Sequence, residues 1–104
     1  MSVRLQETPK AQEDLDQIED FLMERNPDAA RMVIQSVSKT YQGLIAWPEK
    51  GSPLPYKEVR MFPVRGFPQF LVLYRFDIEE SLITVVRVIR GAQDWTRILM
   101  DEED

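Results

Sequence analysis

Five arginines in the second half of the chain are the side chains best suited to bind an anionic group. A planar guanidinium carries a permanent charge and donates paired hydrogen bonds to phosphate and carboxylate groups. All of them fall on or beside segments whose composition predicts β-strands. The five residues are Arg60, Arg65, Arg75, Arg87 and Arg90.

Each of these arginines also has an ordinary structural explanation, because a surface charge is usually solvated or paired with a carboxylate. Alternation along a strand separates them further. Arg60 and Arg65 point to opposite faces of a regular strand, as do Arg87 and Arg90 if their strand continues unbroken. Only a subset can therefore meet at one site. The carboxylates that could pair with them are Glu58, Asp77, Glu79 and Glu80.

The chain contains no histidine and no cysteine. This composition excludes the Ser-His-Asp triad, histidine-based zinc chemistry, thiol nucleophiles and disulfides, and it is compatible with a reducing compartment. We therefore expect no metal site and no cofactor. Any catalysis would depend on Lys, Arg, Tyr and carboxylate groups.

The composition predicts one globular domain over residues 1–104, because 43% of the residues are hydrophobic and 30% are charged. The first seven residues lack the apolar segment of a signal peptide. The longest strongly apolar runs, 70–74 and 82–86, are too short to span a bilayer. We expect a soluble cytoplasmic protein with no membrane partner.

The net charge of −5 conceals an uneven distribution along the chain. Residues 1–46 carry five basic and eight acidic side chains, whereas residues 47–100 carry eight basic and six acidic ones. Four acidic residues form the tail at 101–104. The basic groups that could meet an anionic partner are thus concentrated in the second half.

The first half of the sequence predicts a strand followed by two helices. Residues 3–7 alternate in the manner of a short strand, and Thr8 precedes a proline as an N-cap would. Apolar residues then recur with helical spacing over 9–25. Asn26 begins a second helix that runs toward Trp47. The short connection predicts an antiparallel helical hairpin.

The second half predicts a three-stranded antiparallel meander over 58–64, 69–77 and 81–90. A loop rich in proline and glycine precedes it, and the last two strands should be central because both of their faces are apolar. The overall prediction is an α+β fold with a short C-terminal helix or tail from residue 93. The hairpin would cover one sheet face, and a tail or another molecule would cover the other.

A set of motif residues runs through all the predicted elements: Ala11, Asp14, Leu15, Ile18 and Phe21 in the first helix, Asn26, Pro27, Ala29 and Ala30 at the turn, Leu44, Pro48 and Gly51 near the loop, and Arg60, Phe70, Val72, Tyr74, Ile83, Val85, Val88, Gly91 and Asp94 in the meander. Together with the order and spacing of the elements, these residues resemble the RelE/ParE superfamily of bacterial toxins, especially the ParE-like plasmid-stabilisation proteins. The resemblance covers nearly the whole chain. Two positions depart from the family pattern, since Arg90-Gly91 stands where His-Gly is common and Gln93-Asp94 where Arg-Asp is common.

The resemblance to ParE implies the toxin of a type II toxin–antitoxin system that inhibits growth by trapping DNA gyrase. Such a protein needs a binding surface and no catalytic constellation. For Trp95, the alternative is a core plug that closes the open sheet face. The target-binding candidates are Arg60, Arg90, Trp95, Arg97, Ile98 and Leu99.

The resemblance leaves two other functions open. A RelE-like ribosome-dependent mRNA endoribonuclease, free of metal, would use the five arginines to stabilise the phosphoryl transition state. Members of that group supply a Tyr, Lys, Glu or His near the C-terminus as the general acid or base, where this chain has Trp95. The acidic tail of this chain would also repel RNA. The third reading is an inactive toxin-like module that binds only an antitoxin or another copy of itself, as a homodimer.

A toxin of this class also implies a cognate antitoxin. Its C-terminal segment would lie along an apolar groove between the hairpin and the sheet, or add a strand to a free sheet edge. The antitoxin-binding candidates are Leu15, Leu22, Val33, Val37 and Tyr41.

Overall fold

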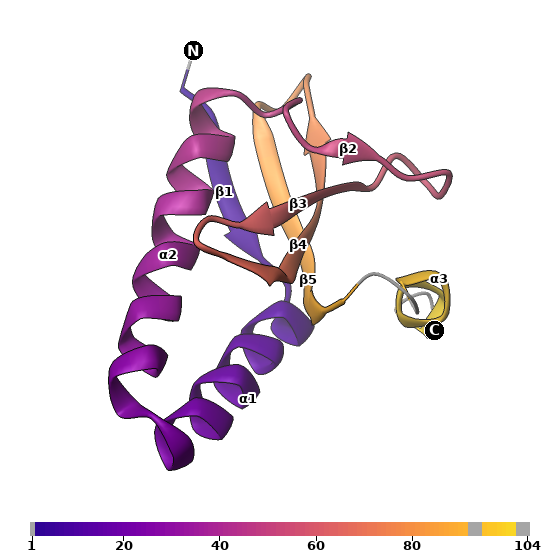
Figure 1. Ribbon diagram of the computed structural model, residues 1–104. Helices are drawn as coiled ribbons and strands as arrows, with labels where there is room; N and C mark the ends of the chain where they lie inside the picture. The colour runs from indigo at the N-terminus through magenta and orange to yellow at the C-terminus, as the bar shows by residue number, and fades with distance from the viewer. Residues whose placement is uncertain (1, 92–94, 102–104) are drawn as a thin grey trace.

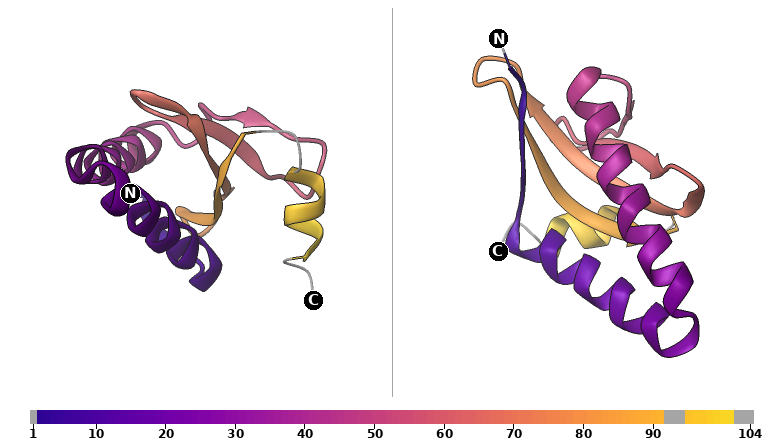
Figure 2. Two further views of the ribbon diagram at one scale, coloured as in Figure 1. Left: turned by 60° about the horizontal axis from the view of Figure 1, so that its bottom comes forward. Right: turned by 90° about the vertical axis from the view of Figure 1, so that its left-hand side faces the viewer.

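A five-stranded sheet lies between two long helices on one side and a short helix on the other (Figures 1 and 2). The computed structural model describes residues 2–91 and 95–101. The predicted α+β architecture is therefore confirmed. The elements are β1 (Arg4–Glu7), α1 (Pro9–Arg25), α2 (Pro27–Ala46), β2 (Ser52–Pro53), β3 (Arg60–Val64), β4 (Phe67–Asp77), β5 (Leu82–Arg90) and α3 (Trp95–Asp101).

Both long helices begin at the caps that the sequence predicts. The Thr8 hydroxyl accepts a hydrogen bond from the amide of Ala11 at 3.1 Å and donates one to the carbonyl of Val86 at 2.8 Å. The cap of α1 thus also fixes the helix to β5. Asn26 Oδ1 accepts from the amide of Ala29 at 3.2 Å, and each helix has proline in its first turn.

The strand order is β1-β5-β4-β3-β2. β1 pairs with β5 in parallel, and the other neighbours pair in antiparallel fashion. The prediction that β4 and β5 are central is correct, because each has a strand on both sides. A register shift between Leu73 and Tyr74 alters the alternation of side chains in β4 relative to β5.

The strands differ from the prediction in their starts and in one additional strand, and the largest differences lie between residues 52 and 67. The strand predicted from residue 58 begins at Arg60, because Lys57 and Glu58 have φ of 44° and 60°, which no strand accommodates. β4 begins at Phe67, so the predicted turn at 64–68 contracts to Arg65 and Gly66. The loop predicted after α2 contains β2, whose two residues pair with the start of β3.

The sheet buries a hydrophobic cluster against α1 and α2. Tyr74, at 0% exposure, is the largest of its side chains. No helix in the part of the chain that the structure describes is long and apolar enough to cross a membrane. The buried members of this cluster are Ala11, Val33, Val37, Leu44, Val64, Phe70, Val72, Tyr74, Ile83, Val85 and Val88.

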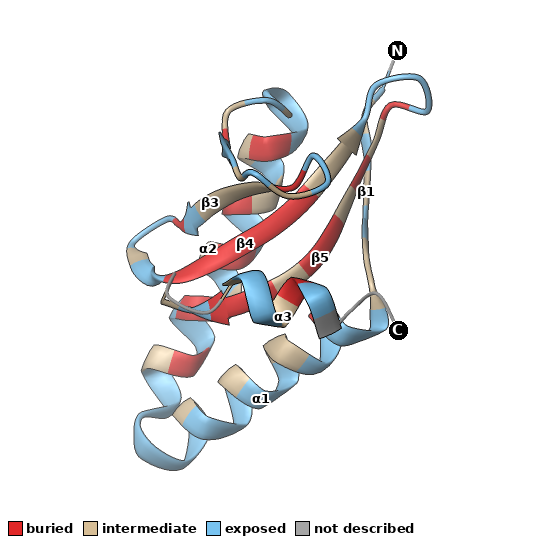
Figure 3. Cartoon of the chain, turned by 90° about the vertical axis from the view of Figure 1, so that its right-hand side faces the viewer, coloured by how far each residue is buried: buried red, intermediate tan, exposed pale blue. Residues whose placement is uncertain are grey.

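The opposite face of the sheet is covered by α3 and by the loop before β3 (Figure 3). Leu99 of α3 is 1% exposed and packs in a cluster with Leu71, Leu73 and Val86 of the central strands. The predicted C-terminal docking helix is therefore present, and the chain itself covers this face. Of the predicted acidic tail, residues 102–104 lie outside the described part, as do Gln93 and Asp94.

Candidate functional site

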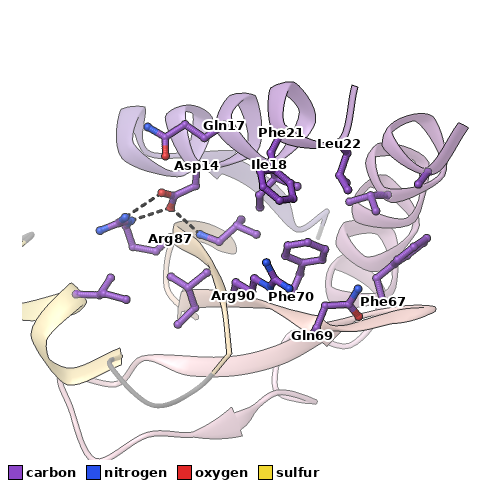
Figure 4. Close-up of a pocket in the computed structure, with 15 residues that line it drawn as sticks. Asp14, Gln17, Ile18, Phe21, Leu22, Phe67, Gln69, Phe70, Arg87 and Arg90 are labelled. Carbon is purple, nitrogen blue, oxygen red and sulfur yellow. Dashed lines mark hydrogen bonds and ion pairs between the residues drawn. The ribbon is translucent and has the colours of Figure 1, made fainter. Parts of the chain in front are cut away.

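An apolar groove of about 470 Å³ opens between α1, the start of α2 and the ends of β4 and β5 (Figure 4). Its size and lining suit the side chains of an inserted peptide segment, which binds by burying apolar anchors. The apolar lining residues are Ile18, Phe21, Leu22, Ala29, Val33, Phe67, Phe70, Val88, Ile89 and Ile98, and the polar ones are Asp14, Gln17, Gln69, Arg87 and Arg90.

The aromatic rings of the groove come from separate parts of the chain. Phe21 lies on the wall formed by α1 and is 46% exposed, whereas Phe70 is 7% exposed and belongs to the core beneath it. Phe67 lies at the first position of β4. Phe21 is half exposed, so a partner that covers it removes apolar surface from water, and this burial favours binding.

A bidentate ion pair between Asp14 and Arg87 lies on the polar side of the groove (Figure 4). Asp14 Oδ2 lies 2.7 Å from Arg87 Nε, and Asp14 Oδ1 lies 2.8 Å from Arg87 Nη2. Asp14 Oδ2 also accepts a hydrogen bond from the amide of Val88 at 2.9 Å. With side-chain exposures of 11% and 18%, the pair is mostly shielded and fixes α1 to β5.

Arg90 is the cation of the apolar groove that remains available to a partner. Its side chain lines the groove, and its Cα pairs in register with that of Phe70. Arg90 is exposed, and its guanidinium forms no ion pair or hydrogen bond with any other residue that the structure describes. The Arg90 guanidinium can therefore bind a carboxylate of a partner segment without losing a contact to another described residue.

Two of the five residues predicted to bind an antitoxin line this groove, namely Leu22 and Val33. Leu15 and Val37 instead pack within the core cluster. Tyr41 also lies away from the groove, and its hydroxyl donates a hydrogen bond to Glu7 Oε2 at 2.7 Å. Burial raises the pKa of the Tyr41 phenol well above its ordinary value, and the hydrogen bond to Glu7 adds to the shift.

The structure does not bring the five predicted arginines together. Arg60 donates to the carbonyls of Glu49 at 2.9 Å and Gly51 at 2.8 Å, and Arg75 donates to the carbonyl of Lys57 at 3.0 Å. With Arg87 bound to Asp14, three of the five are engaged in structural contacts.

The carboxylates predicted to pair with these arginines have other positions. The carboxylate that pairs with Arg60 is that of Glu49, whose Oε2 lies 3.8 Å from Arg60 Nη2. The carboxylate that pairs with Arg87 is that of Asp14. Asp77 instead accepts hydrogen bonds from the amides of Glu79 and Glu80, and so stabilises the turn between β4 and β5. Asp77, Glu79 and Glu80 are exposed in this turn, where the sequence places them.

The C-terminal candidates for target binding divide between the surface and the core. Arg97 is exposed, whereas Leu99 is buried against the sheet. Leu99 is therefore not on the surface, and its role in target binding stays a prediction. Trp95 packs on the same cluster, with its ring 6.4 Å from that of Tyr56, and Ile98 reaches the apolar groove. The contacts of Trp95 are those of a core plug.

Tyr74 is a structural residue and is not placed as a proton donor for catalysis. Its hydroxyl donates to the carbonyl of Pro48 at 2.8 Å and accepts from the amide of Gly51 at 2.9 Å. Burial raises the pKa of its phenol. Within residues 2–91 and 95–101, no group of three or more His, Cys, Asp or Glu side chains could hold a metal ion.

The sequence and the fold were compared with known proteins. The family described as "ParE toxin of type II toxin-antitoxin system, parDE" matches residues 5–95. The protein named "Putative toxin Y4kP" from Sinorhizobium fredii (strain NBRC 101917 / NGR234) is 26% identical over 96 residues, which cover 92% of this chain and 96% of that protein.

Two solved structures have a similar fold. A chain of the chromosomal ParDE TA system from P. aeruginosa has a TM-score of 0.71 and 23% identity, with 88% of this chain and 98% of that chain covered. A chain of the RelBE2 toxin-antitoxin complex from Mycobacterium tuberculosis has a TM-score of 0.60 and 22% identity, with 86% and 99% covered.

The structural matches show the shared fold, and the family match shows the membership. The matched range, residues 5–95, contains both long helices, all of β3, β4 and β5, and the ion pair between Asp14 and Arg87. The chain belongs to the ParE toxin family of type II toxin–antitoxin systems.

Proposed function

We propose that this ParE-family toxin inhibits bacterial growth by binding DNA gyrase, without a catalytic step of its own. The observation that carries the proposal is the dispersal of its arginines. Arg60 and Arg75 donate to backbone carbonyls, and Arg87 is bound to Asp14. A ribonuclease site needs several cations around one phosphate together with an acid or base, and the five predicted arginines form no such group.

The apolar groove is the proposed binding site for a cognate antitoxin. An amphipathic segment would place apolar side chains against Phe21 and Leu22 and a carboxylate beside Arg90. The groove lies on the same side of the sheet as the two long helices (Figure 4). Such a pair of proteins would serve plasmid stabilisation and act in the cytoplasm, where gyrase and its DNA lie.

Supercoiling of a relaxed plasmid by purified gyrase tests the proposed target. We expect the wild-type chain to inhibit supercoiling and to increase the amount of linear DNA recovered after protease treatment. Arg97→Glu should reduce this inhibition, since Arg97 is exposed on α3. Arg4→Glu, the same change of charge on β1, serves as the matched control.

Two results would replace the proposal with one of its alternatives. Cleavage of mRNA on translating ribosomes, with gyrase unaffected, would identify a ribosome-dependent endoribonuclease. If expression of the chain without an antitoxin left growth, gyrase and translation unchanged, the chain would be an inactive binding module. In cells, induction of the DNA damage response before translation stops would support gyrase as the target.

A further inference from the structure

A second groove, of about 590 Å³, lies between the later half of α2 and the turn that joins β3 to β4. It shares no lining residue with the apolar groove. Three cationic side chains line it, each from a different segment: Lys39 from α2, Lys50 from the loop that follows, and Arg65 from the turn. We call it the basic groove.

The fold fixes the two long walls of the basic groove against each other. The Thr40 hydroxyl accepts a hydrogen bond from the amide of Arg65 at 2.9 Å and donates one to the carbonyl of Ser36 at 2.7 Å. Thr40 is 3% exposed, so this link is shielded from water. Figure 1 shows the β3–β4 turn beside α2. The backbone that carries Arg65 is thus held next to Lys39.

Lys50 is directed into the same space by its contacts. Its ammonium lies 4.7 Å from the centre of the Phe62 ring, within the range of a cation–π contact. Lys50 passes over Gly43, where a Cβ atom would stand 2.9 Å from its Nζ. Because Gly43 has no side chain, α2 leaves the room that Lys50 needs. These contacts therefore hold the ammonium group of Lys50 in the basic groove.

The described part of the chain supplies no carboxylate to these three cations. None of its acidic residues lines the basic groove. Among the residues that the structure describes, the side chains of Lys39, Lys50 and Arg65 form no ion pair. Other arginines of the chain have a carboxylate partner, as Arg31 has in Asp28 and Arg60 in Glu49. Three positive charges thus line one groove without an ion pair to any described residue, although the chain has a net charge of −5.

We propose that the basic groove binds the phosphate groups of a nucleic-acid backbone. Lysine ammonium groups bind phosphate as point charges, and Arg65 adds a guanidinium that can bind two phosphate oxygens. Three cations from three segments suit successive phosphates of a strand, since contacts of this kind depend on charge and not on base sequence.

This inference deepens the proposed function and rests on it for its biological setting. Gyrase acts on DNA, so a toxin bound to it lies beside a phosphate backbone. Basic side chains facing that backbone would add affinity for the complex of gyrase with DNA over gyrase alone. None of the described carboxylates of α1 lines the basic groove.

Fluorescence anisotropy with a labelled 20-base-pair duplex tests the basic groove without gyrase. The groove variant is Lys39→Glu/Arg65→Glu, which keeps the Thr40 hydrogen bond because that bond uses the backbone of residue 65. The control variant is Arg4→Glu/Lys10→Glu, which makes the same change of net charge on β1 and α1. Circular dichroism and thermal melting should show that both variants remain folded.

We expect the groove variant to lose at least about tenfold in duplex affinity, and the control to lose less than about threefold. For the wild type, log K should fall with log salt with a slope of about −2.7, since each neutralised phosphate contributes roughly −0.9. The slope of the groove variant should be smaller in magnitude by about two such contributions. Single-stranded RNA and inorganic pyrophosphate serve as further probes, to distinguish a DNA source of the phosphates from RNA or a free anion.

Three results would overturn the assignment. Equal loss in both variants would show a general effect of net charge. Duplex binding that is absent even at 50 mM salt, or tighter binding of pyrophosphate than of either nucleic acid, would exclude a backbone ligand. A glutamate-rich peptide that displaces the duplex at equal charge concentration would assign the groove to an acidic protein. If the duplex binds as expected while gyrase is unaffected, the proposed target fails and the groove assignment stands.

Discussion

Asp14 of α1 and Arg87 of β5 contact each other through two parallel hydrogen bonds of 2.7 and 2.8 Å, although 73 residues separate them. Asp14 also binds the amide of Val88, so one carboxylate accepts three donors from a single strand. This contact holds the first helix against the sheet at the edge of the apolar groove. The pair therefore joins the α1 wall of the groove to β5.

Removal of the Asp14 carboxylate should destabilise the fold. Asp14→Ala leaves the guanidinium of Arg87 mostly shielded and the amide of Val88 without its acceptor. We expect the free energy of unfolding to fall by about 1.5–3 kcal/mol, the range for a hydrogen bond to a charged group. Urea denaturation measures it. Asp16→Ala, an exposed carboxylate on the same helix, should change it by less than about 0.5 kcal/mol. Equal effects would contradict a special role for Asp14.

Substitutions in the apolar groove should weaken antitoxin binding while the fold stays intact. Phe21 is 46% exposed, so Phe21→Asp places a charge where an apolar partner side chain would lie, without opening the core. We expect at least about a tenfold loss of affinity by calorimetry, equivalent to about 1.4 kcal/mol. Met32→Asp is the matched control, because Met32 is 56% exposed on α2 and does not line the groove. A loss confined to Met32→Asp would move the antitoxin to another surface.

Arg90→Glu provides a separate test of charge in the same groove. Arg90 has no ion pair with another described residue, so its reversal should leave stability almost unchanged. We expect weaker binding of an acidic antitoxin segment and a smaller dependence of that binding on salt. Surface plasmon resonance at two salt concentrations would show both effects. An unchanged salt dependence would mean that Arg90 faces no carboxylate in the complex.

Tyr74→Phe should lower stability through the loop that follows α2. The hydroxyl joins the carbonyl of Pro48 to the amide of Gly51, and phenylalanine would leave both without that partner. The expected loss is about 1–3 kcal/mol, the cost of an unsatisfied buried polar group. Thermal unfolding measures this loss. Tyr56→Phe, at a partly buried tyrosine, removes a hydroxyl that forms no hydrogen bond with any other described residue, and it should have little effect. The idea fails if the two variants melt together.

Stability should also fall at alkaline pH because of Tyr41. Its pKa is raised in the folded protein relative to the ordinary value of 10.0, so the folded state holds its proton more tightly than the unfolded state does. The resulting stabilisation is complete below pH 10 and is lost as the pH rises above it. Urea midpoints between pH 8 and 11 should therefore decline, and Tyr41→Phe should make the decline shallower. A parallel decline in wild type and variant would contradict the assignment.

The helices could be predicted from the sequence because their signals are local. Thr8 and Asn26 stand directly before prolines, and each side chain caps the helix that follows. The strand β2 could not be predicted, since its two residues pair only after Lys57 and Glu58 adopt positive φ. A conformation of that kind depends on the surrounding chain and not on residue type alone.

The candidate site was predictable only in part, for a related reason. The apolar stripe of α2 contains both Val33 and Val37, but of the two only Val33 lines the apolar groove. Which part of a stripe remains uncovered depends on where β4 begins, and that is a tertiary property. The pairing of Asp14 with Arg87 could not be predicted either, because no local sequence pattern indicates a contact between residues 73 positions apart.

The parallel pairing of β1 with β5 has a consequence for synthesis. Residues 4–7 leave the ribosome long before their partners at 82–85, which are about 78 positions later in the chain. A nascent chain can form its helical hairpin early, but the sheet must wait until β5 has been synthesised. Premature termination before β5 would therefore yield a fragment that cannot close its sheet, so a message cut short should produce no toxic protein.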